Sequence, residues 1–132
     1  MKDQGPDTNE ELLHFRRALA IAPVAVFRQD EQLRYTWIGN PPLMLLPESA
    51  LGRTDEELFG AEIAAPLTAV KRRVLESGRG ERGEVSLPHG GESRCWDLRL
   101  EPCREASGRV IGIRGAAVDM TEHKRAAAAL TE

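Results

Sequence analysis

Hydrophobic positions recur along the chain with two different spacings, and the first stretch has the spacing of a helix. Leu12, Phe15 and Leu19 are three and four residues apart, which places them on one face of a helix. Thr8 opens a capping box ahead of this stripe, and a proline follows it. The pattern therefore predicts a helix from about residue 8 to residue 21.

The next two segments alternate apolar and polar residues, which is the period of a strand. We expect one strand over residues 24–29 and a second over residues 33–38, with a turn at residues 30–32 between them. Tyr35 and Trp37 are two residues apart and are expected on one face of the second strand. Two aromatic residues so placed fit either core packing or a platform for a ligand.

From residue 39 to about residue 60 the chain has no clear period. Thr54 and Glu57 fit a second capping box, which predicts a helix of about one turn. A longer helix follows, and we expect Pro66 in its first turn, where a missing N–H does no harm. Gly78 is expected just past the end of that helix.

The longer helix has an apolar face and a basic triplet. The residues of the apolar face are Leu67, Val70, Val74 and Leu75. The triplet Lys71-Arg72-Arg73 lies mostly off this face. We interpret it as a solvated surface rather than a binding patch.

The last part of the chain predicts three strands. The first, over residues 84–87, is short, and in the second Trp96 and Leu98 begin an alternation with charged residues. Gly108 fits a hairpin turn, and the strand over residues 110–118 is apolar on both faces, which favours a central position. The order of elements predicts an α+β fold with one antiparallel sheet of five strands.

Composition and charge fit one domain. The chain has 132 residues, of which 41% are hydrophobic and 30% charged, and its net charge is -3. It has no basic block, so we expect no nucleic-acid partner. It has neither an apolar run of the roughly 18 residues that span a bilayer nor a signal peptide. We therefore expect a cytoplasmic location and no membrane contact by this segment.

The two cysteines are expected to be free thiols. Cys95 and Cys103 are eight residues apart, which on one strand is about 26 Å. A disulfide needs Cα atoms within about 7 Å. The pair also lacks the spacing of metal ligands, so we interpret both as small hydrophobic residues in a reducing compartment.

Four segments carry a resemblance to a known family. They are Asp30–Tyr35 leading to Gly39-Asn40, Leu51–Phe59, Trp96–Pro102 followed by Gly108–Gly112, and Asp119–Glu122. In this order they resemble a PAS domain, the sensory module common in bacterial signalling proteins, over about residues 10–125. The last segment is similar to the Asp-Ile-Thr-Glu junction that ends many such domains, with Met120 in place of Ile.

The resemblance implies a PAS-like sheet of five antiparallel strands, with short helices on one face and a pocket between them. It also implies an N-terminal flanking helix and a C-terminal exit helix that commonly forms a dimeric coiled coil. The expected organisation is a disordered tail at 1–8, the flanking helix at 9–22, the PAS core at 23–119 and the start of the signalling helix at 120–132.

A ligand in such a pocket is expected to contact side chains from the sheet and the longer helix. The candidates are Tyr35, Trp37, Leu67, Val70, Trp96, Leu98, Ile113 and Ala117. A shift of one residue in the pairing register exchanges the two faces of a strand. The sequence alone therefore does not determine which face of each strand points into the pocket.

The resemblance also guides the expectations about cofactors, whose identity stays open. The light-sensing flavin subtype needs a reactive cysteine after the second strand, and residues 39–44 contain none. The haem-binding subtype has a histidine on the long helix, whereas the histidines here are His14, His89 and His123. We expect neither covalent flavin nor haem. We also find no catalytic motif and no metal-ligand spacing, so the domain itself is not expected to be an enzyme.

The junction between the last strand and the exit helix is the expected route of output. Asp119 is predicted to cap that helix, with Glu122 completing a capping box and Thr121 adding a hydroxyl. A shift of the last strand would then tilt or rotate the exit helix.

The expected partners are a second copy of the chain and an output domain that follows the exit helix. We expect a homodimer through the face of Leu12, Phe15 and Leu19, joined by Ala126 and Leu130 of the exit helix. The exit helix is short and rich in alanine, so it needs a partner to be stable.

Two classes of function fit these observations. The first is a sensor in a two-component system, which binds a small ligand or senses a cytoplasmic cue and transmits it to an output domain. The expected output is a histidine kinase, and a diguanylate cyclase or another output is the alternative. The second is a dimerisation or protein-interaction module without a ligand. A cavity of about 300 Å³ with converging polar groups would favour the first, and a filled core the second. An enzyme is the weakest interpretation.

Overall fold

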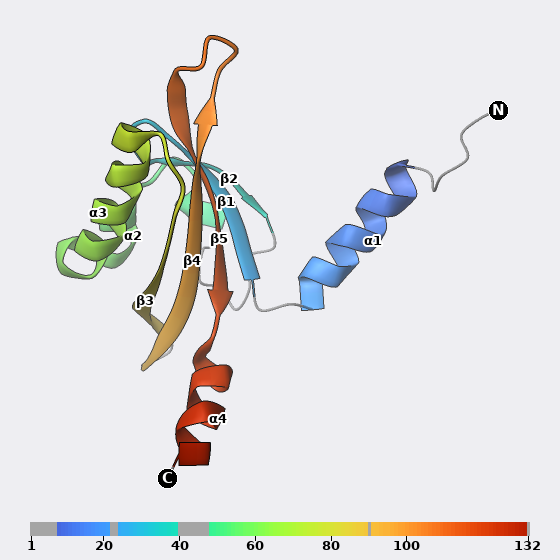
Figure 1. Cartoon of the computed structure of the whole chain (residues 1–132), viewed down its shortest axis with the longest axis vertical. Helices are drawn as coiled ribbons and strands as arrows, with labels where there is room; N and C mark the ends of the chain where they lie inside the picture. The colour runs from blue at the N-terminus through green and yellow to red at the C-terminus, as the bar shows by residue number, and fades with distance from the viewer. Residues whose placement is uncertain (1–7, 22–23, 40–47, 90, 132) are drawn as a thin grey trace.

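One antiparallel sheet lies at the centre of the structure (Figure 1). The computed structural model describes residues 8–21, 24–39, 48–89 and 91–131. The strands are β1 (Val24–Asp30), β2 (Tyr35–Gly39), β3 (Glu81–His89), β4 (Glu92–Arg104) and β5 (Val110–Asp119). Their order is β2-β1-β5-β4-β3, with every neighbouring pair antiparallel, so β5 is central, as its apolar sequence predicts. The predicted α+β fold is confirmed.

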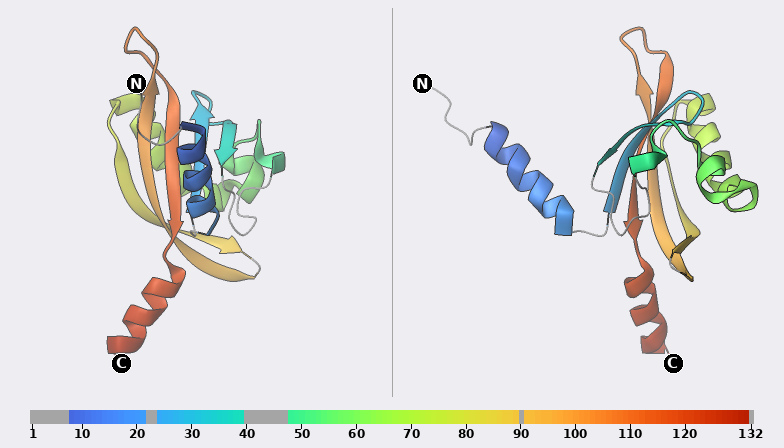
Figure 2. Two further views of the ribbon diagram at one scale, coloured as in Figure 1. Left: turned by 90° about the vertical axis from the view of Figure 1, so that its right-hand side faces the viewer. Right: turned by 180° about the vertical axis from the view of Figure 1, so that it is seen from behind.

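Of the α-helices in the described part of the chain, two cover the sheet and two project from it, and a short 3-10 helix lies between β2 and the first of the covering helices. They are α1 (Thr8–Ile21), the 3-10 helix η2 (Glu48–Ala50), α2 (Asp55–Phe59), α3 (Ala61–Ser77) and α4 (Thr121–Thr131). We call the face covered by α2 and α3 the inner face and the opposite one the outer face (Figure 1). Helix α4 extends from the end of the sheet in both views of Figure 2, and α1 is seen to project from the sheet in the right-hand view. Thr8 belongs to α1 rather than to the predicted tail, of which residues 1–7 lie outside the described residues.

The alternation along β1 and β4 decides which side chains reach the inner face. Phe27, Trp96 and Leu98 are buried there. Leu67 and Val74 of α3 belong to the same core. Burial of each such side chain stabilises the fold by about 1.5–3 kcal/mol.

Helix α3 begins five residues before Pro66, so the prediction that this proline lies in the first turn is wrong. Gly60, with a φ of 90°, ends α2 and directly precedes α3. The amide of Ala64 donates to the carbonyl of Gly60 at 3.0 Å and closes the first turn before the proline is reached. At the other end Gly78 has a left-handed φ of 70°, as predicted.

Strand β3 is longer than the predicted segment 84–87. It pairs with β4 along nine positions, from Glu81 with Leu100 to His89 with Glu92. Pro88 interrupts the apolar pattern, but β3 is an edge strand, where proline is tolerated.

Tyr35 and Trp37 lie on opposite faces of the sheet, against the prediction that they share one. On β1 the neighbours Arg28 and Gln29 pair with Trp37 and Tyr35, so Thr36 is an extra residue in β2. Such a β-bulge reverses the side of every residue beyond it. Tyr35 is therefore turned inward and 3% exposed, whereas Trp37 is turned outward and 55% exposed.

Candidate functional site

A buried ion pair joins α2 and α3 beneath the sheet. The ammonium of Lys71 on α3 lies 2.5 Å from Oδ2 of Asp55, the first residue of α2. Lys71 Nζ also donates to the hydroxyl of Tyr35 at 3.2 Å, and that hydroxyl donates to Asp55 Oδ1 at 2.6 Å. The three groups form a closed triangle that links two helices to β2.

Burial and charge act in opposite directions on the Lys71 ammonium. The loss of surrounding water lowers its pKa, the carboxylate of Asp55 raises it, and the net pKa is below the ordinary 10.5. Burial, and then the charge of Asp55, raise the pKa of Tyr35 well above 10.0, so its hydroxyl stays a donor. The rings of Phe27 and Tyr35 lie 5.0 and 5.2 Å from Nζ and add cation–π attraction.

The prediction that Lys71 lies on a solvated face is wrong, since its side chain is 1% exposed. Lys71 is four residues after Leu67 and three before Val74, so it belongs to the buried stripe of α3. Arg72 and Arg73 are exposed, as predicted. The helical spacing alone places Lys71 on the buried face of α3. Its charge led to its assignment to the surface together with Arg72 and Arg73.

The cavity between the sheet and α3 is small. Its volume is about 20 Å³, which is room for about one water molecule. Its walls come from Phe27, Tyr35, Phe59, Leu67, Lys71, Val85, Leu87, Trp96, Leu98 and Ala117. Trp96 is buried, and its Nε1 has no hydrogen-bond partner in the described part of the chain. The inner face therefore holds a nearly filled core with one unpartnered donor.

The predicted pocket residues lie at four different places in the structure. Those that line the inner cavity are Tyr35, Leu67, Trp96, Leu98 and Ala117. Ile113 is fully buried in the core, and Val70 lines a groove between α3 and β3. Trp37 lies on the outer face because of the bulge in β2. The wall residues that sequence reasoning missed are Phe27, Phe59, Lys71, Val85 and Leu87.

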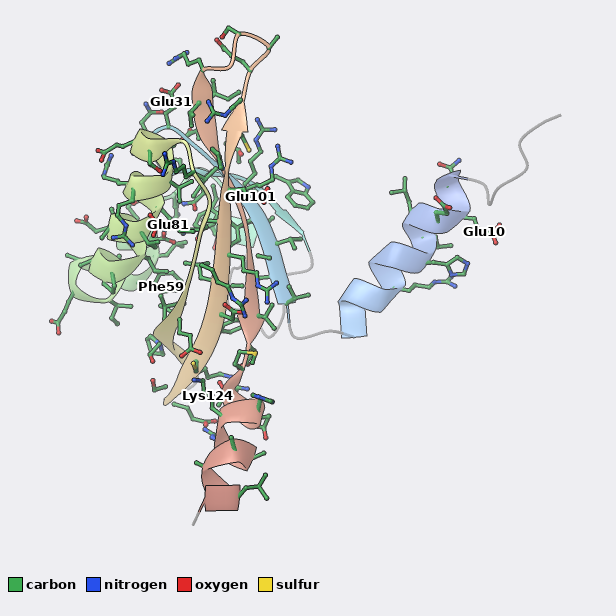
Figure 3. The ribbon with its side chains drawn as sticks, in the orientation of Figure 1. Glu10, Glu31, Phe59, Glu81, Glu101 and Lys124 are labelled. Atoms are coloured by element: carbon green, nitrogen blue, oxygen red, sulfur yellow. The ribbon has the colours of Figure 1, made fainter. Side chains whose placement is uncertain are left out.

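A larger hollow lies on the outer face and is called the outer trough. It has a volume of about 330 Å³ and crosses β2, β1, β5 and β4. Its lining residues are Val26, Phe27, Trp37, Arg99, Glu101, Arg114, Gly115 and Ala116. Figure 3 shows Glu101 on this side of the sheet, away from Phe59 of α2.

The junction between β5 and α4 is held by bonds to β4. Arg94 Nε lies 2.8 Å from Asp119 Oδ2. The amide of Met120 donates to the carbonyl of Cys95 at 2.8 Å, and the amide of Cys95 donates to Thr121 Oγ1 at 2.9 Å. Burial alone would raise the pKa of Asp119, but hydrogen bonds from Thr121 and Arg94 lower it below 3.8.

The predicted capping box at this junction is not formed as expected. Asp119 is the last residue of β5, and Met120 occupies the capping position, with its carbonyl accepting from Lys124 at 2.8 Å. The carboxylate of Asp119 still accepts from the amide of Thr121 at 2.9 Å. Glu122 is 82% exposed and lies 3.8 Å from Arg125 instead of reaching back. The strand continues one residue further than predicted, because β5 pairs with β4 up to Asp119.

Two further ion pairs tie the first turns of α4 to the sheet. Lys124 lies 3.0 Å from Glu84 of β3, and Arg125 lies 2.6 Å from Glu92 of β4. Figure 3 shows Lys124 where α4 meets the end of the sheet. Both pairs are exposed, so each contributes about 0–1 kcal/mol.

Within residues 8–21, 24–39, 48–89 and 91–131, no group of three or more acidic, histidine or cysteine side chains could hold a metal ion. Both cysteines are free and lie on β4. No helix among these residues is long and apolar enough to cross a bilayer.

Comparison with known proteins identifies relatives over most of the chain. The profile of a family described as "PAS fold" matches residues 19–125. The chain is 32% identical over 106 residues to probable histidine kinase 1 of Oryza sativa subsp. indica, covering 79% of this chain and 11% of the relative. It is 37% identical over 117 residues to the methanogenesis regulatory histidine kinase FilI of Methanothrix harundinacea, covering 85% of this chain and 13% of the relative. The chain thus spans about an eighth of the length of these kinases.

A solved structure supports the fold. The chain matches VqmA of Vibrio cholerae with a TM-score of 0.71 and 22% sequence identity, over 89% of this chain and 53% of that one. The structure is described as a VqmA dimer in the absence of target DNA. At this level of identity the likeness concerns the fold alone.

Proposed function

Because the chain belongs to the PAS fold family, we propose that it is the sensory segment of a histidine kinase in two-component signal transduction and controls the kinase through β5 and α4. Relatives from a plant and from Methanothrix harundinacea are both histidine kinases, which supports this output. The family also precedes other outputs, such as diguanylate cyclases. A cytoplasmic location and the absence of nucleic-acid partners remain predictions from composition and charge.

The observation that carries the proposal is the set of bonds between β4 and the junction. Arg94 and Cys95 are consecutive on β4, and they hold Asp119, Met120 and Thr121 through the three contacts described above. Thr121 is 5% exposed, so its bond to Cys95 is shielded from water. A displacement of β4 relative to β5 would therefore move the start of α4. A coupling of about 1–3 kcal/mol is enough for regulation.

The size of the inner cavity bears on the nature of the cue. An inner cavity of about 20 Å³ is far below the roughly 300 Å³ of an ordinary ligand pocket. A small-molecule ligand would have to displace core side chains to enter. This observation favours the second candidate function, an interaction module that responds to contacts on its surface and has no ligand.

The test uses the full-length protein and its autophosphorylation rate. Asp119→Ala and Arg94→Ala remove the same ion pair from either side and should each change that rate several-fold while the PAS core stays folded. Arg109→Ala is the matched control, because Arg109 forms an exposed ion pair with Glu31 at 2.8 Å, away from the junction. Unchanged autophosphorylation in both junction variants would refute the proposed route.

A further inference from the structure

Two arginines stand side by side at the centre of the outer face. Arg28 on β1 and Arg114 on β5 are a cross-strand pair, so their side chains start about 5 Å apart and their like charges repel. The described residues form no ion pair with either of them, and Arg114 Nε bonds the sulfur of Cys103 at 3.4 Å instead. The two guanidinium groups are therefore placed to share one anion.

A second cross-strand arginine pair shows how the sheet resolves the same conflict elsewhere. Arg82 and Arg99 face each other on β3 and β4. Asp97 lies between them, 3.0 Å from Arg82 and 3.3 Å from Arg99. No carboxylate of the described residues bridges the central pair in this way, so its charge is left to a group from outside the sheet.

The next row of outward side chains is apolar and low. Val26 and Ala116 are cross-strand partners on β1 and β5, and both line the outer trough. The small side chain of Ala116 lies between Val26 and Arg99, its partner on β4, and leaves the hollow open there. Rows two residues apart along a strand are separated by about 7 Å. An apolar floor thus lies about the length of an aromatic ring from the arginine pair.

Trp37 forms one end of the trough and adds an aromatic wall. It pairs with Arg28 and is 55% exposed. Its indole lies over Gly39, where a Cβ would be 2.5 Å from Trp37 Cη2 and 2.9 Å from Val26 Cγ2. The lack of a side chain at Gly39 therefore lets the indole lie close to the apolar floor. An exposed aromatic ring in this position offers a surface for a planar apolar group.

We propose that the outer trough binds a small molecule that joins a planar apolar body to a carboxylate. The body lies on Val26 and Ala116 against the indole of Trp37, and the carboxylate bridges Arg28 and Arg114. The trough volume of about 330 Å³ falls within the range of small-molecule sites. Hydrogen bonds from arginine to a carboxylate are about twice as strong as those between neutral groups.

The charges beside the trough favour a carboxylate over a phosphate dianion. Glu101 stands opposite Arg114 on β4 and also lines the trough. Together with Arg28 and Arg114 it leaves one net positive charge, which a carboxylate matches. The trough also accepts such a ligand without displacement of core side chains, unlike the nearly filled inner face.

The site lies on the strand that leads to the junction. Arg114 belongs to β5, whose last residue is Asp119. A ligand held between β1 and β5 acts directly on the strand that precedes α4. This regulatory consequence rests on the proposed function, whereas binding in the trough does not.

The site is built from the sheet and uses no part of α1. The homodimer expected through Leu12, Phe15 and Leu19 stays a separate prediction. Leu12 is exposed, and the side chains of Phe15 and Leu19 lie outside the described residues.

Titration of the chain with naphthoate tests the site, and naphthamide is the neutral control of the same shape. Naphthoate should bind saturably with a Kd of about 1 mM or tighter, about tenfold tighter than naphthamide. Arg28→Gln combined with Arg114→Gln should abolish this preference and leave the affinity for naphthamide unchanged. Arg72→Gln is the matched control, because Arg72 is exposed on α3 at the other side of the sheet, and it should keep the preference.

The indole N–H signals in an NMR spectrum locate the probe. The chain has two tryptophans, of which Trp37 lines the outer trough and Trp96 the inner cavity. Naphthoate should shift the signal of Trp37, identified by its loss in Trp37→Phe, and leave that of Trp96 in place. Ala116→Leu fills the trough from the outer side and should weaken binding of both compounds about tenfold or more.

Loss of folding does not explain a loss of binding in these variants. Arg28→Gln removes a repulsive contact, so it should not lower the free energy of unfolding in urea. Three results would overturn the site: equal affinity of the wild type for the two compounds, a preference that survives in the double arginine variant, or a shift of Trp96 in place of Trp37. A Trp37 signal that does not respond, as when a second copy of the chain covers the trough, overturns it too.

Autophosphorylation of the full-length protein with and without naphthoate is the separate test of output. Binding in the trough that leaves this rate unchanged supports the site and contradicts only the route from β5 to α4.

Discussion

Lys71 and Asp55 form an ion pair in which both side chains are at least 98% buried, and it joins the two helices that cover the inner face. The side-chain exposures of 1% and 2% leave no water to solvate either charge alone. Removal of one member of a buried pair is therefore far more damaging than removal of both. The triangle with Tyr35 should behave as a unit that fixes α2 and α3 to β2.

Lys71→Ala should lower the free energy of unfolding by about 3–5 kcal/mol, because it leaves the carboxylate of Asp55 buried without its counter-ion. The combination of Lys71→Met with Asp55→Leu should cost clearly less than Lys71→Ala, since it leaves no buried charge. Urea denaturation of the isolated chain measures both. Arg72→Ala is the control on the same helix and should stay within about 0.5 kcal/mol of the wild type. A double variant less stable than Lys71→Ala would contradict this view of the pair.

Gly115→Ala should destabilise the fold by about 1–3 kcal/mol, because the added methyl group would overpack the core. A Cβ at this position of the central strand would lie 2.5 Å from Phe27 Cζ and 2.8 Å from Leu100 Cδ2. Gly83→Ala is the matched control on edge strand β3, where a Cβ meets nothing within 4 Å. Equal thermal midpoints for the two variants would show that the side chains near Phe27 accommodate the added methyl group without loss of stability.

The elements of this fold could be predicted from the sequence because periodicity and capping are local signals. The Thr54–Glu57 capping box is present. The amide of Thr54 donates to Glu57 Oε1 at 3.0 Å, and the amide of Glu57 donates to Thr54 Oγ1 at 3.2 Å. The turn at Gly108 and the central position of β5 follow from similar local patterns.

The parts of the candidate site that were missed depend on pairing between distant segments. The bulge at Thr36 is visible only when β1 is aligned with β2, and it moves Trp37 from the predicted pocket to the outer face. Lys71 is buried because Asp55, sixteen residues earlier, meets it across the helix pair. The role of Cys95 at the junction arises from the registration of β4 against β5, which no pattern within either strand determines.

Stability should depend on Asp119 in acid. Its pKa lies below 3.8 in the folded chain, so the folded state binds this proton less tightly than the unfolded state. The carboxylate therefore stabilises the fold fully at pH values above its unfolded pKa, and this contribution is lost as the pH falls through the folded pKa. The difference in unfolding free energy between wild type and Asp119→Asn should be constant near pH 7 and shrink between about pH 5 and pH 2.

Chemical denaturation at several pH values measures that difference. Asp30→Asn is a control on β1, because Asp30 accepts from the amides of Gln32 and Arg34 in an exposed turn away from α4. If the difference in unfolding free energy between wild type and Asp119→Asn stays the same down to pH 2, the charge of Asp119 does not stabilise the junction.

Thr121→Val should separate the junction's role in output from its role in stability. Valine keeps the shape of the side chain but removes the oxygen that accepts from the partly buried amide of Cys95. The loss should cost about 1–3 kcal/mol of stability and, in the full-length protein, should alter autophosphorylation at a temperature where the variant is fully folded. Thr36→Val is the matched control, because Thr36 Oγ1 donates to the carbonyl of Arg28 at 3.2 Å on the exposed β-bulge. If both threonine variants change autophosphorylation to the same extent, the effect reflects general loosening of the sheet; a response confined to Thr121→Val identifies the bond between β4 and α4 as part of the signalling route.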